Sequence, residues 1–222
     1  MVFRSKDNWF RDNLLCSNCK CIPRERALMK VIEDYYPNWQ ELRIHESSPA
    51  NRGASVKISQ YCKNYTGTHF YPNSPFGEKI LNQYQNENLE KQTFGDESFD
   101  LVISQDVFEH LFDIESAFSE IARTLKKGGA HIFTTPLVNF TKPTEIWAKK
   151  TDKGEIIHLK EPEYHGNPID PKGSLVTYHF GYDICDLIFN SSGLHTAIVK
   201  IENLNFGISA EYIEVLVSKK AK

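Results

Sequence analysis

The sequence predicts an α/β fold built on a doubly wound, mostly parallel sheet. Residues 87–136 carry the strongest pattern, because Phe99–Ser104 and Ala130–Thr134 are short apolar runs typical of buried strands. Between them, the apolar residues of Ile114–Leu125 recur on one face of a helix. The first of the two strands ends in polar residues, and the carboxyl end of a central parallel strand is where such sheets bind ligands.

The remaining elements extend the same alternation of strands and helices along the chain. Pro23 is suited to open a helix over Arg24–Tyr35, and Pro37 ends it. Lys126–Gly129 supply the basic residues and glycines that commonly end a helix, here the central one. The other expected elements are strands at Glu41–Glu46, Tyr65–Phe70, Leu194–Ile201 and Tyr212–Ser218, helices at Gly53–Tyr61 and Tyr182–Asn190, a loop at Pro72–Gly77, and a third strand reached through residues 84–89.

Composition narrows the possible functions. The chain has 222 residues and a net charge of −3, so no basic surface points to nucleic acid. No apolar run approaches the length of a membrane span, and the first residues are too polar for a signal sequence. Five cysteines without an export signal are typical of reduced thiols, which predicts a cytoplasmic protein.

Three motifs in residues 87–136 resemble the class I S-adenosylmethionine (SAM) dependent methyltransferases, and most of all their type 11 branch. Ser98-Phe99-Asp100, Glu109-His110-Leu111 and Arg123–Gly129 match that branch almost letter for letter, in the same order. Gln92-Thr93-Phe94 stands where the family has Leu-Pro-Phe. The other interpretation is an ordinary strand–helix–strand unit of a different α/β enzyme, since one fold hosts many functions.

The resemblance implies a Rossmann-like methyltransferase sheet whose last strand runs antiparallel to the others. It also implies an enzyme that uses SAM and releases S-adenosylhomocysteine. We predict a single methyltransferase domain over residues 1–222. Its parts are an N-terminal, cysteine-containing and helical extension (1–38), a SAM-binding half (39–136), an insertion that acts as a lid (137–176), and a C-terminal helix with strands (177–222).

The glycine-rich turn of the family is altered in this chain. The first strand of the family ends in an acidic residue followed by glycines, because the backbone passes close to the cofactor. Here the acidic residue is Glu46, followed by Ser47 and Ser48, and small residues stand where glycines are usual. Serine hydroxyls are able to donate to the carboxylate of SAM, so we expect Glu46, Ser47 and Ser48 to line the cofactor site.

The next three strands supply the other expected contacts. His69 replaces the acidic residue that grips the ribose diol, so it is either a one-hydroxyl ligand or a packed strand residue. Asn88 and the Leu89 amide align with the family's adenine-binding pair. Ser104 and Gln105 should face the methionine part of SAM, and Asp106 has the character of a helix N-cap.

Histidines and a tyrosine mark the expected acceptor side. An oxygen nucleophile usually needs a general base, and Tyr164, His165 and His179 cluster in or beside the insertion. His165 is the leading candidate for the base, in a turn set by Gly166 and Pro168, with a structural role as the alternative. His110, on the expected helix after the fourth strand, is the other candidate base. The expected acceptor is a small-molecule hydroxyl, such as that of a sugar or secondary metabolite.

Two N-terminal features remain open. Cys16, Cys19 and Cys21 form half of a zinc-binding pattern without a second pair at the right spacing, so we assign no metal ligand. Arg24 and its neighbours either hold the SAM carboxylate or form a solvated helix start. The altered turn and His69 also allow a second class of function, a degenerate methyltransferase-like domain that binds a partner without catalysis.

Overall fold

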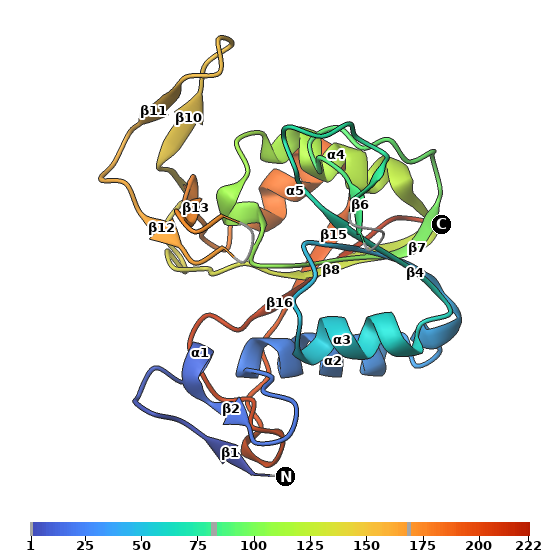
Figure 1. Ribbon diagram of the computed structural model, residues 1–222, viewed down its shortest axis with the longest axis vertical. Coiled ribbons are helices and arrows are strands. Elements are labelled where there is room, and N and C mark those ends of the chain that lie inside the picture. The colour runs from blue at the N-terminus through green and yellow to red at the C-terminus, as the bar shows by residue number, and fades with distance from the viewer. Residues whose placement is uncertain (1, 81–83, 168–169) are drawn as a thin grey trace.

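The computed structural model describes residues 2–80, 84–167 and 170–222, and its core is one eight-stranded sheet (Figure 1). The strands follow the order β15-β16-β8-β7-β3-β4-β6-β5. Only β16 and β5 run antiparallel to their neighbours, as predicted for the last strand. The bounds are β3 (Arg43–Ser47), β4 (Asn64–His69), β5 (Lys79–Ile80), β6 (Tyr84–Asn86), β7 (Phe99–Gln105), β8 (Leu125–Thr134), β15 (His195–Val199) and β16 (Val215–Lys219).

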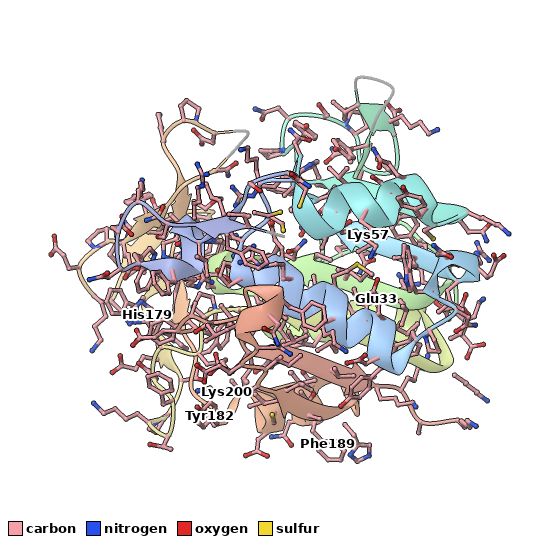
Figure 2. All side chains as sticks on the ribbon, turned by 90° about the horizontal axis from the view of Figure 1, so that it is seen from below. Glu33, Lys57, His179, Tyr182, Phe189 and Lys200 are labelled. Carbon is pink, nitrogen blue, oxygen red and sulfur yellow. The ribbon has the colours of Figure 1, made fainter. Side chains whose placement is uncertain are left out.

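Helices cover both faces of the sheet, which confirms the doubly wound arrangement. α2 (Pro23–Tyr35) and α3 (Gly53–Tyr61) lie below it in Figure 1, and α4 (Ile114–Thr124) and α5 (Ile184–Ser192) lie above. Each face has its own buried apolar cluster. On the lower face Lys57 of α3 pairs with Glu33 of α2 at 2.5 Å (Figure 2). No helix among the described residues is long and apolar enough to cross a membrane.

The central helix forms where its apolar pattern predicted. Asp113 caps α4, because its side chain accepts a hydrogen bond from the Ser116 amide at 2.9 Å. The face that packs on the sheet is buried, and its members are Ile114, Ala117, Phe118, Ile121 and Ala122. The helix therefore presents the loop between β7 and α4 at a fixed position on the sheet edge.

The segment after α4 differs from the prediction. Lys126–Gly129 do not form a terminating turn but continue into β8, which begins at Leu125. Lys126 pairs with Asp100 at 2.8 Å, and a Cβ on Gly129 would come within 2.8 Å of the Asp100 carbonyl oxygen. The glycines thus allow β8 to pass close to β7, and this contact with the neighbouring strand was not visible in the sequence pattern.

The N-terminal extension folds next to α2 (Figure 1). Its elements are β1 (Phe3–Arg4), α1 (Phe10–Asn13) and β2 (Leu15–Cys16). They are too short to give a periodic sequence pattern, so the sequence did not predict them. Arg26 of α2 fastens the extension, donating to the carbonyls of Leu14 and Gly207 at 2.9 and 2.6 Å and lying over the ring of Phe3. The extension is therefore tied to α2 and to the C-terminal part of the chain.

The insertion consists of short antiparallel ribbons instead of an irregular loop. The pairs are β10 with β11, β12 with β13, and β9 with β14. The β10–β11 hairpin projects away from the sheet (Figure 1). The bounds are β9 (Glu145–Ile146), β10 (Ala148–Lys150), β11 (Ile156–His158), β12 (Tyr164–His165), β13 (Ser174–Leu175) and β14 (Tyr178–His179), and three 3-10 turns are η1 (Trp39–Glu41), η2 (Phe108–His110) and η3 (Leu204–Phe206).

Candidate active site

The predicted cofactor residues lie along one edge of the sheet. β3, β4, β6 and β7 are parallel, so their carboxyl ends meet at this edge. The structure brings together the ends and following loops of these four strands. The residues predicted there are Glu46, Ser47, Ser48, His69, Asn88, Leu89, Ser104 and Gln105.

Glu46 is the centre of a buried hydrogen-bond network. Its carboxylate is fully buried and accepts from Ser55 at 2.6 Å, Tyr65 at 2.9 Å and Gln105 at 3.2 Å. Burial raises the pKa of Glu46, and the three donors counteract part of that shift. Glu46 therefore fixes the start of α3 and the end of β7 relative to each other. Ser47 beside it is also buried.

The altered turn keeps a backbone shape that glycine would favour. Ser48 has a φ of 55°, and its amide donates to the Thr68 carbonyl at 2.7 Å. Gly53, at the start of α3, has a φ of 58°. A Cβ on Gly53 would come within 2.2 Å of Glu25 Oε2, so this position has no space for a side chain.

His69 is both a strand-end residue and a support for the turn. Its ring is largely buried, meets Tyr84 edge-on at 4.5 Å, and donates a hydrogen bond to the Pro49 carbonyl. Burial lowers the pKa of His69, so the imidazole is neutral near pH 7. A neutral ring that donates through one nitrogen keeps the other as an acceptor, which suffices for one ribose hydroxyl.

The side chains expected to contact the adenine and the methionine part of SAM differ in how many of their hydrogen bonds are already made within the protein. Asn88 is half-buried and its Oδ1 accepts from the Glu90 amide at 3.0 Å, while Leu89 is buried beside it. The Ser104 hydroxyl shares a hydrogen bond with His131 at 3.1 Å inside the sheet. Of the pair at the end of β7, Gln105 therefore has the more available side chain.

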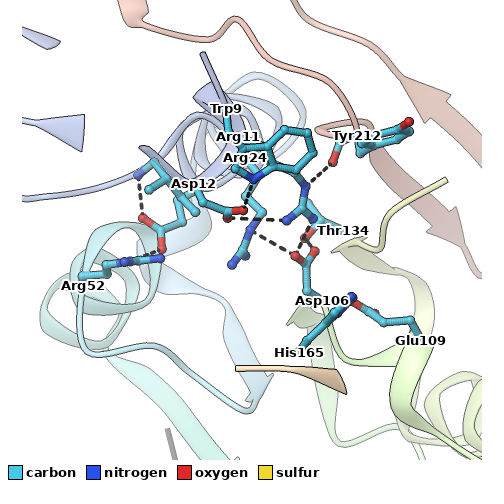
Figure 3. Close-up of polar contacts among 12 residues, drawn as sticks. Trp9, Arg11, Asp12, Arg24, Arg52, Asp106, Glu109, Thr134, His165 and Tyr212 are labelled. Carbon is cyan, nitrogen blue, oxygen red and sulfur yellow. Dashed lines mark hydrogen bonds and ion pairs between the residues drawn. The ribbon is translucent and has the colours of Figure 1, made fainter. Parts of the chain in front are cut away.

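Two arginines of the N-terminal part reach the same edge (Figure 3). Arg11 pairs with Asp106 at 2.5 Å, Arg24 lies 3.1 Å from Asp106, and Thr134 donates to the same carboxylate. Although burial opposes ionisation, the charges of Arg24 and Arg11 hold the pKa of Asp106 below its usual range. The expectation that Asp106 caps a helix is wrong, since Val107 precedes η2 and Asp106 has a φ of 51°.

The same cluster corrects the view of Arg24 as a solvated helix start. Its side chain is only 15% exposed and lies against the Asp106 carboxylate. Gln105 Oε1 is buried without a hydrogen-bond partner among the described residues, whereas the Arg24 guanidinium is paired through Nε with Asp106 at 3.1 Å. The amino-acid end of SAM carries a carboxylate and an ammonium, which are the groups that a guanidinium and an amide oxygen bind. The residues at this edge therefore fit SAM.

A second cluster joins the insertion to the loop after β7. His165 and His179 both contact the Glu163 carboxylate, at 3.1 and 3.0 Å. The ring of His165 lies 5.1 Å from the ring of His110, and His179 stacks on Trp147 at 3.8 Å. The structure thus gathers the predicted histidines in one place, next to the end of the cofactor edge.

Tyr164 does not join this cluster. The side chain of Tyr164 is 56% exposed and lies on the strand face away from His165. The turn expected at Gly166 and Pro168 falls partly outside the described residues, since Pro168 is not among them.

Glu109 is the functional candidate that sequence reasoning missed. Its carboxylate is buried, and Thr135 donates to its Oε2 at 2.9 Å. Burial, with the nearby charge of Asp106, raises the pKa of Glu109 to about 7. The available signal was its place beside His110 in the matched motif, but a charged residue after a strand is normally read as solvent-exposed.

The N-terminal cysteines lie close together. Cys16, Cys19 and Cys21 each offer a sulfur within 4.8 Å of the others, and Cys19 Sγ is 3.2 Å from Cys21 Sγ. Burial raises the pKa of Cys21 to about 12. A structural zinc site usually has four protein ligands, and among the described residues this group supplies three. A zinc ion there remains a hypothesis.

Comparison with known proteins agrees with this geometry. Residues 52–133 match the family model described as "Methyltransferase domain". No curated protein sequence matches the chain. A solved SAM-dependent methyltransferase from Mesorhizobium loti is 17% identical with a TM-score of 0.54, covering 87% of this chain and 97% of its own.

Two structures determined with S-adenosylhomocysteine share the fold as well. The Haemonchus contortus phosphoethanolamine N-methyltransferase 2 is 14% identical with a TM-score of 0.52, covering 88% of this chain and 53% of its own. The Burkholderia thailandensis 1,6-didemethyltoxoflavin-N1-methyltransferase is 11% identical with a TM-score of 0.50, covering 90% and 79%. The chain therefore shares its fold with solved SAM-dependent methyltransferases, and residues 52–133, which carry much of the cofactor edge, match the methyltransferase-domain model.

Proposed function

We propose that the chain transfers the methyl group of SAM to a hydroxyl of a small molecule, such as a sugar or a secondary metabolite. The observation that carries this proposal is the cluster of Glu109, His110, Glu163, His165 and His179 next to the cofactor edge. Imidazoles beside a methyl donor are suited to take a proton from an oxygen nucleophile. The two S-adenosylhomocysteine-bound neighbours are named as N-methyltransferases, so the acceptor atom rests on this cluster and not on them.

Binding and orientation fall to the residues of the sheet edge. SAM supplies an electrophilic methyl group, and the protein has to align that group with the acceptor oxygen. We expect Arg24 and Gln105 to hold the amino-acid end, His69 one ribose hydroxyl, and Asn88 with the Leu89 amide the adenine. Glu46 has its three donors already, so its role is to position Ser55 and Gln105.

The proton of the acceptor hydroxyl passes to an imidazole held by Glu163. Because a carboxylate only accepts, the Nε2 atoms of His165 and His179 donate to Glu163. Each neutral ring then has its Nδ1 lone pair free to accept a proton. His165 is the first candidate, since it also lies beside His110, and the insertion that carries it would limit the access of water.

The proposal also covers the location of the protein, the kind of acceptor and the extent of the domain. The five free cysteines support a reducing, cytoplasmic location. The net charge of −3 supports a small-molecule acceptor over nucleic acid. We also propose that residues 1–222 act as one methyltransferase domain with residues 137–176 as its cover.

Calorimetry and thermal shift with SAM and S-adenosylhomocysteine give the first test. A ligand at 100 times its dissociation constant adds about 2.7 kcal/mol to the free energy of unfolding, so a clear rise in melting temperature is expected. No heat and no shift with either ligand would instead favour a degenerate domain that binds a partner. The altered turn and the engagement of His69 with Pro49 would then be read as losses of cofactor binding.

His165→Asn in a single-turnover assay tests the role of the cluster. Methyl transfer should fall by about a hundredfold while SAM affinity is unchanged. His195→Asn is the matched control, because His195 is exposed on β15, where its ring contacts Phe189 and lies outside the Glu163 cluster. Equal loss of folding and SAM binding in His165→Asn would make His165 structural and remove it from the mechanism.

A further inference from the structure

Three side chains at the acceptor side have the arrangement of a metal-binding site. Glu109, His110 and His165 each offer one ligand atom, and these atoms all lie within 4.8 Å of one another. Glu109 and His110 come from η2, while His165 comes from β12 of the insertion. Two imidazoles and a carboxylate form a common ligand set for divalent transition ions.

The carboxylate of Glu109 has one oxygen without a partner. Glu109 is 2% exposed, and its Oε1 has no hydrogen bond from any described residue. This oxygen lies 3.8 Å from His110 Nε2, so it points into the group. The other oxygen is held by Thr135 at 2.9 Å. Leaving a buried carboxylate oxygen unsatisfied is unfavourable, and a bound cation would satisfy it.

The ring of His110 is fixed in the orientation that a ligand needs. Its Nδ1 is 2.9 Å from the Leu175 carbonyl, and because a carbonyl only accepts, Nδ1 carries the proton. Nε2 therefore has a free lone pair on the side of Glu109. A ligand histidine whose other nitrogen donates to a carbonyl is the usual pattern around protein-bound metals.

The backbone around the group is also held in place. Thr177 donates to the Glu109 carbonyl through its amide at 2.7 Å and through its hydroxyl at 3.0 Å. The same hydroxyl is 2.5 Å from the Leu111 carbonyl. The loop after β7 is thus bonded to the residue that follows the insertion, and the His110 bond to Leu175 ties the same loop to β13.

We propose that Glu109, His110 and His165 bind a divalent transition ion, such as Mn²⁺, Co²⁺ or Zn²⁺, at the acceptor side of the cofactor edge. Three protein ligands leave a coordination position open, which suits an oxygen of the acceptor. Its use in catalysis rests on the proposed function. The ion weakens the O–H bond of the bound hydroxyl, whose proton passes to His179 while the oxygen takes the methyl group and the C–S bond of the sulfonium breaks.

This site divides the work between the two histidines on Glu163. With an ion present, His165 is a ligand, and His179 is the remaining imidazole beside Glu163 that accepts the proton. His165 variants should therefore lose ion binding and methyl transfer together. His179 variants should lose methyl transfer alone.

The experiment is a titration of the chelator-treated full chain with Mn²⁺ and Co²⁺, followed by calorimetry and by the cobalt absorption spectrum. The background carries Cys19→Ser and Cys21→Ser, so that the N-terminal thiols do not contribute. One equivalent of ion should bind, with a spectrum free of thiolate bands. Glu109→Gln and His165→Gln should each weaken binding by more than about tenfold, and His179→Gln should leave it unchanged.

Thermal melting of each variant shows whether it folds, and His165→Gln is the safer one because His165 is partly exposed. No ion binding at millimolar concentration, or binding that neither Glu109→Gln nor His165→Gln weakens, would overturn the proposal. SAM binding is measured in parallel. A chain that binds SAM but no ion keeps the proposed function without the metal site, and one that binds the ion but not SAM loses the proposed function alone.

Discussion

At Gly53 the left-handed backbone and the nearby Glu25 carboxylate leave no space for a side chain. We expect Gly53→Ala to lower the free energy of unfolding by about 2 kcal/mol or more. Alanine is strained at this φ, and its Cβ would displace a buried carboxylate that holds Ile22 and Arg52. Urea unfolding measures the loss.

Gly95→Ala is the control for this substitution. The nearest atom to a Cβ at Gly95 is Ser98 Oγ at 3.8 Å, and its φ lies outside the left-handed region. Its stability should change by less than about 0.5 kcal/mol. Equal effects of the two substitutions would show that the crowding at Gly53 is not the cause.

Asn88 tests the adenine contact. Asn88→Ala should weaken SAM binding by about 0.5–1.5 kcal/mol, the contribution of one hydrogen bond, with the fold intact. Because Asn88 Oδ1 also accepts the Glu90 amide, Asn88→Asp is the matched variant, which keeps an acceptor for that turn. Calorimetry with SAM gives both affinities, and an unchanged affinity in Asn88→Ala would mean that another residue binds adenine.

Residue positions in the matched motifs were predictable, but their partners were not. Strand-end positions such as His69 and Gln105 follow from the alternation of strands and helices. The pairing of Asp106 with Arg11 joins residues 95 positions apart, and no local pattern records such a distance. Glu109 was missed for a similar reason, because its burial is produced by the insertion that folds over it.

Among the elements, the N-terminal extension is joined to the rest of the molecule partly through Arg26. Arg26→Leu should release the extension, since Arg26 donates to the Leu14 and Gly207 carbonyls and lies over Phe3. Hydrogen exchange of amides in residues 2–22 should become at least about tenfold faster, while β7 and β8 stay protected.

Lys30→Leu is the control on the same helix, because Lys30 makes only an exposed pair with Asp34. Unchanged exchange in Arg26→Leu would mean that the extension is held mainly by Arg11 and its partners. SAM affinity of Arg26→Leu, measured alongside, reports whether Arg24 keeps its position when the extension is loosened.

Element types were predictable where periodicity is long. α3 and α4 formed over the expected residues within one position, because helices of nine and eleven residues give several turns of pattern. The two-residue strands of the extension and the insertion give none. Their pairing is decided by contacts with distant parts of the chain, as with β9 and β14.

At the scale of the whole molecule, two buried histidines predict acid sensitivity. Burial lowers the pKa of His45 and of His131 to about 3. The unfolded chain binds a proton at each site below about pH 6.5, whereas the folded chain does so only near pH 3. Each histidine therefore lowers the free energy of unfolding as pH falls through this window, with a slope of up to about 1.4 kcal/mol per pH unit. Glu109, whose pKa is raised to about 7, acts in the opposite direction between about pH 7 and the ordinary pKa of a glutamate.

Urea unfolding at pH 7, 6 and 5 measures that slope. His131→Gln keeps a partner for the Ser104 hydroxyl and removes one titrating group, so its stability should depend less on pH. Because Glu109 acts in the opposite direction over this range, the deciding quantity is the difference between the two proteins. An equal pH dependence of wild type and His131→Gln would contradict the assignment of a neutral, buried His131.

The hydrogen bonds from Arg26 to the Gly207 carbonyl have a consequence for folding during synthesis of the chain. These residues are 181 positions apart, so during synthesis the extension leaves the ribosome long before its partner exists. The hydrogen bond from Arg11 to the Tyr212 carbonyl joins residues that are 201 positions apart, so it forms later still. Arg11, which pairs with Asp106 at the cofactor edge, thus gains its contact with Tyr212 only after residue 212 has been translated. The nascent chain accordingly cannot complete these two contacts while residues 207–212 are still to be translated.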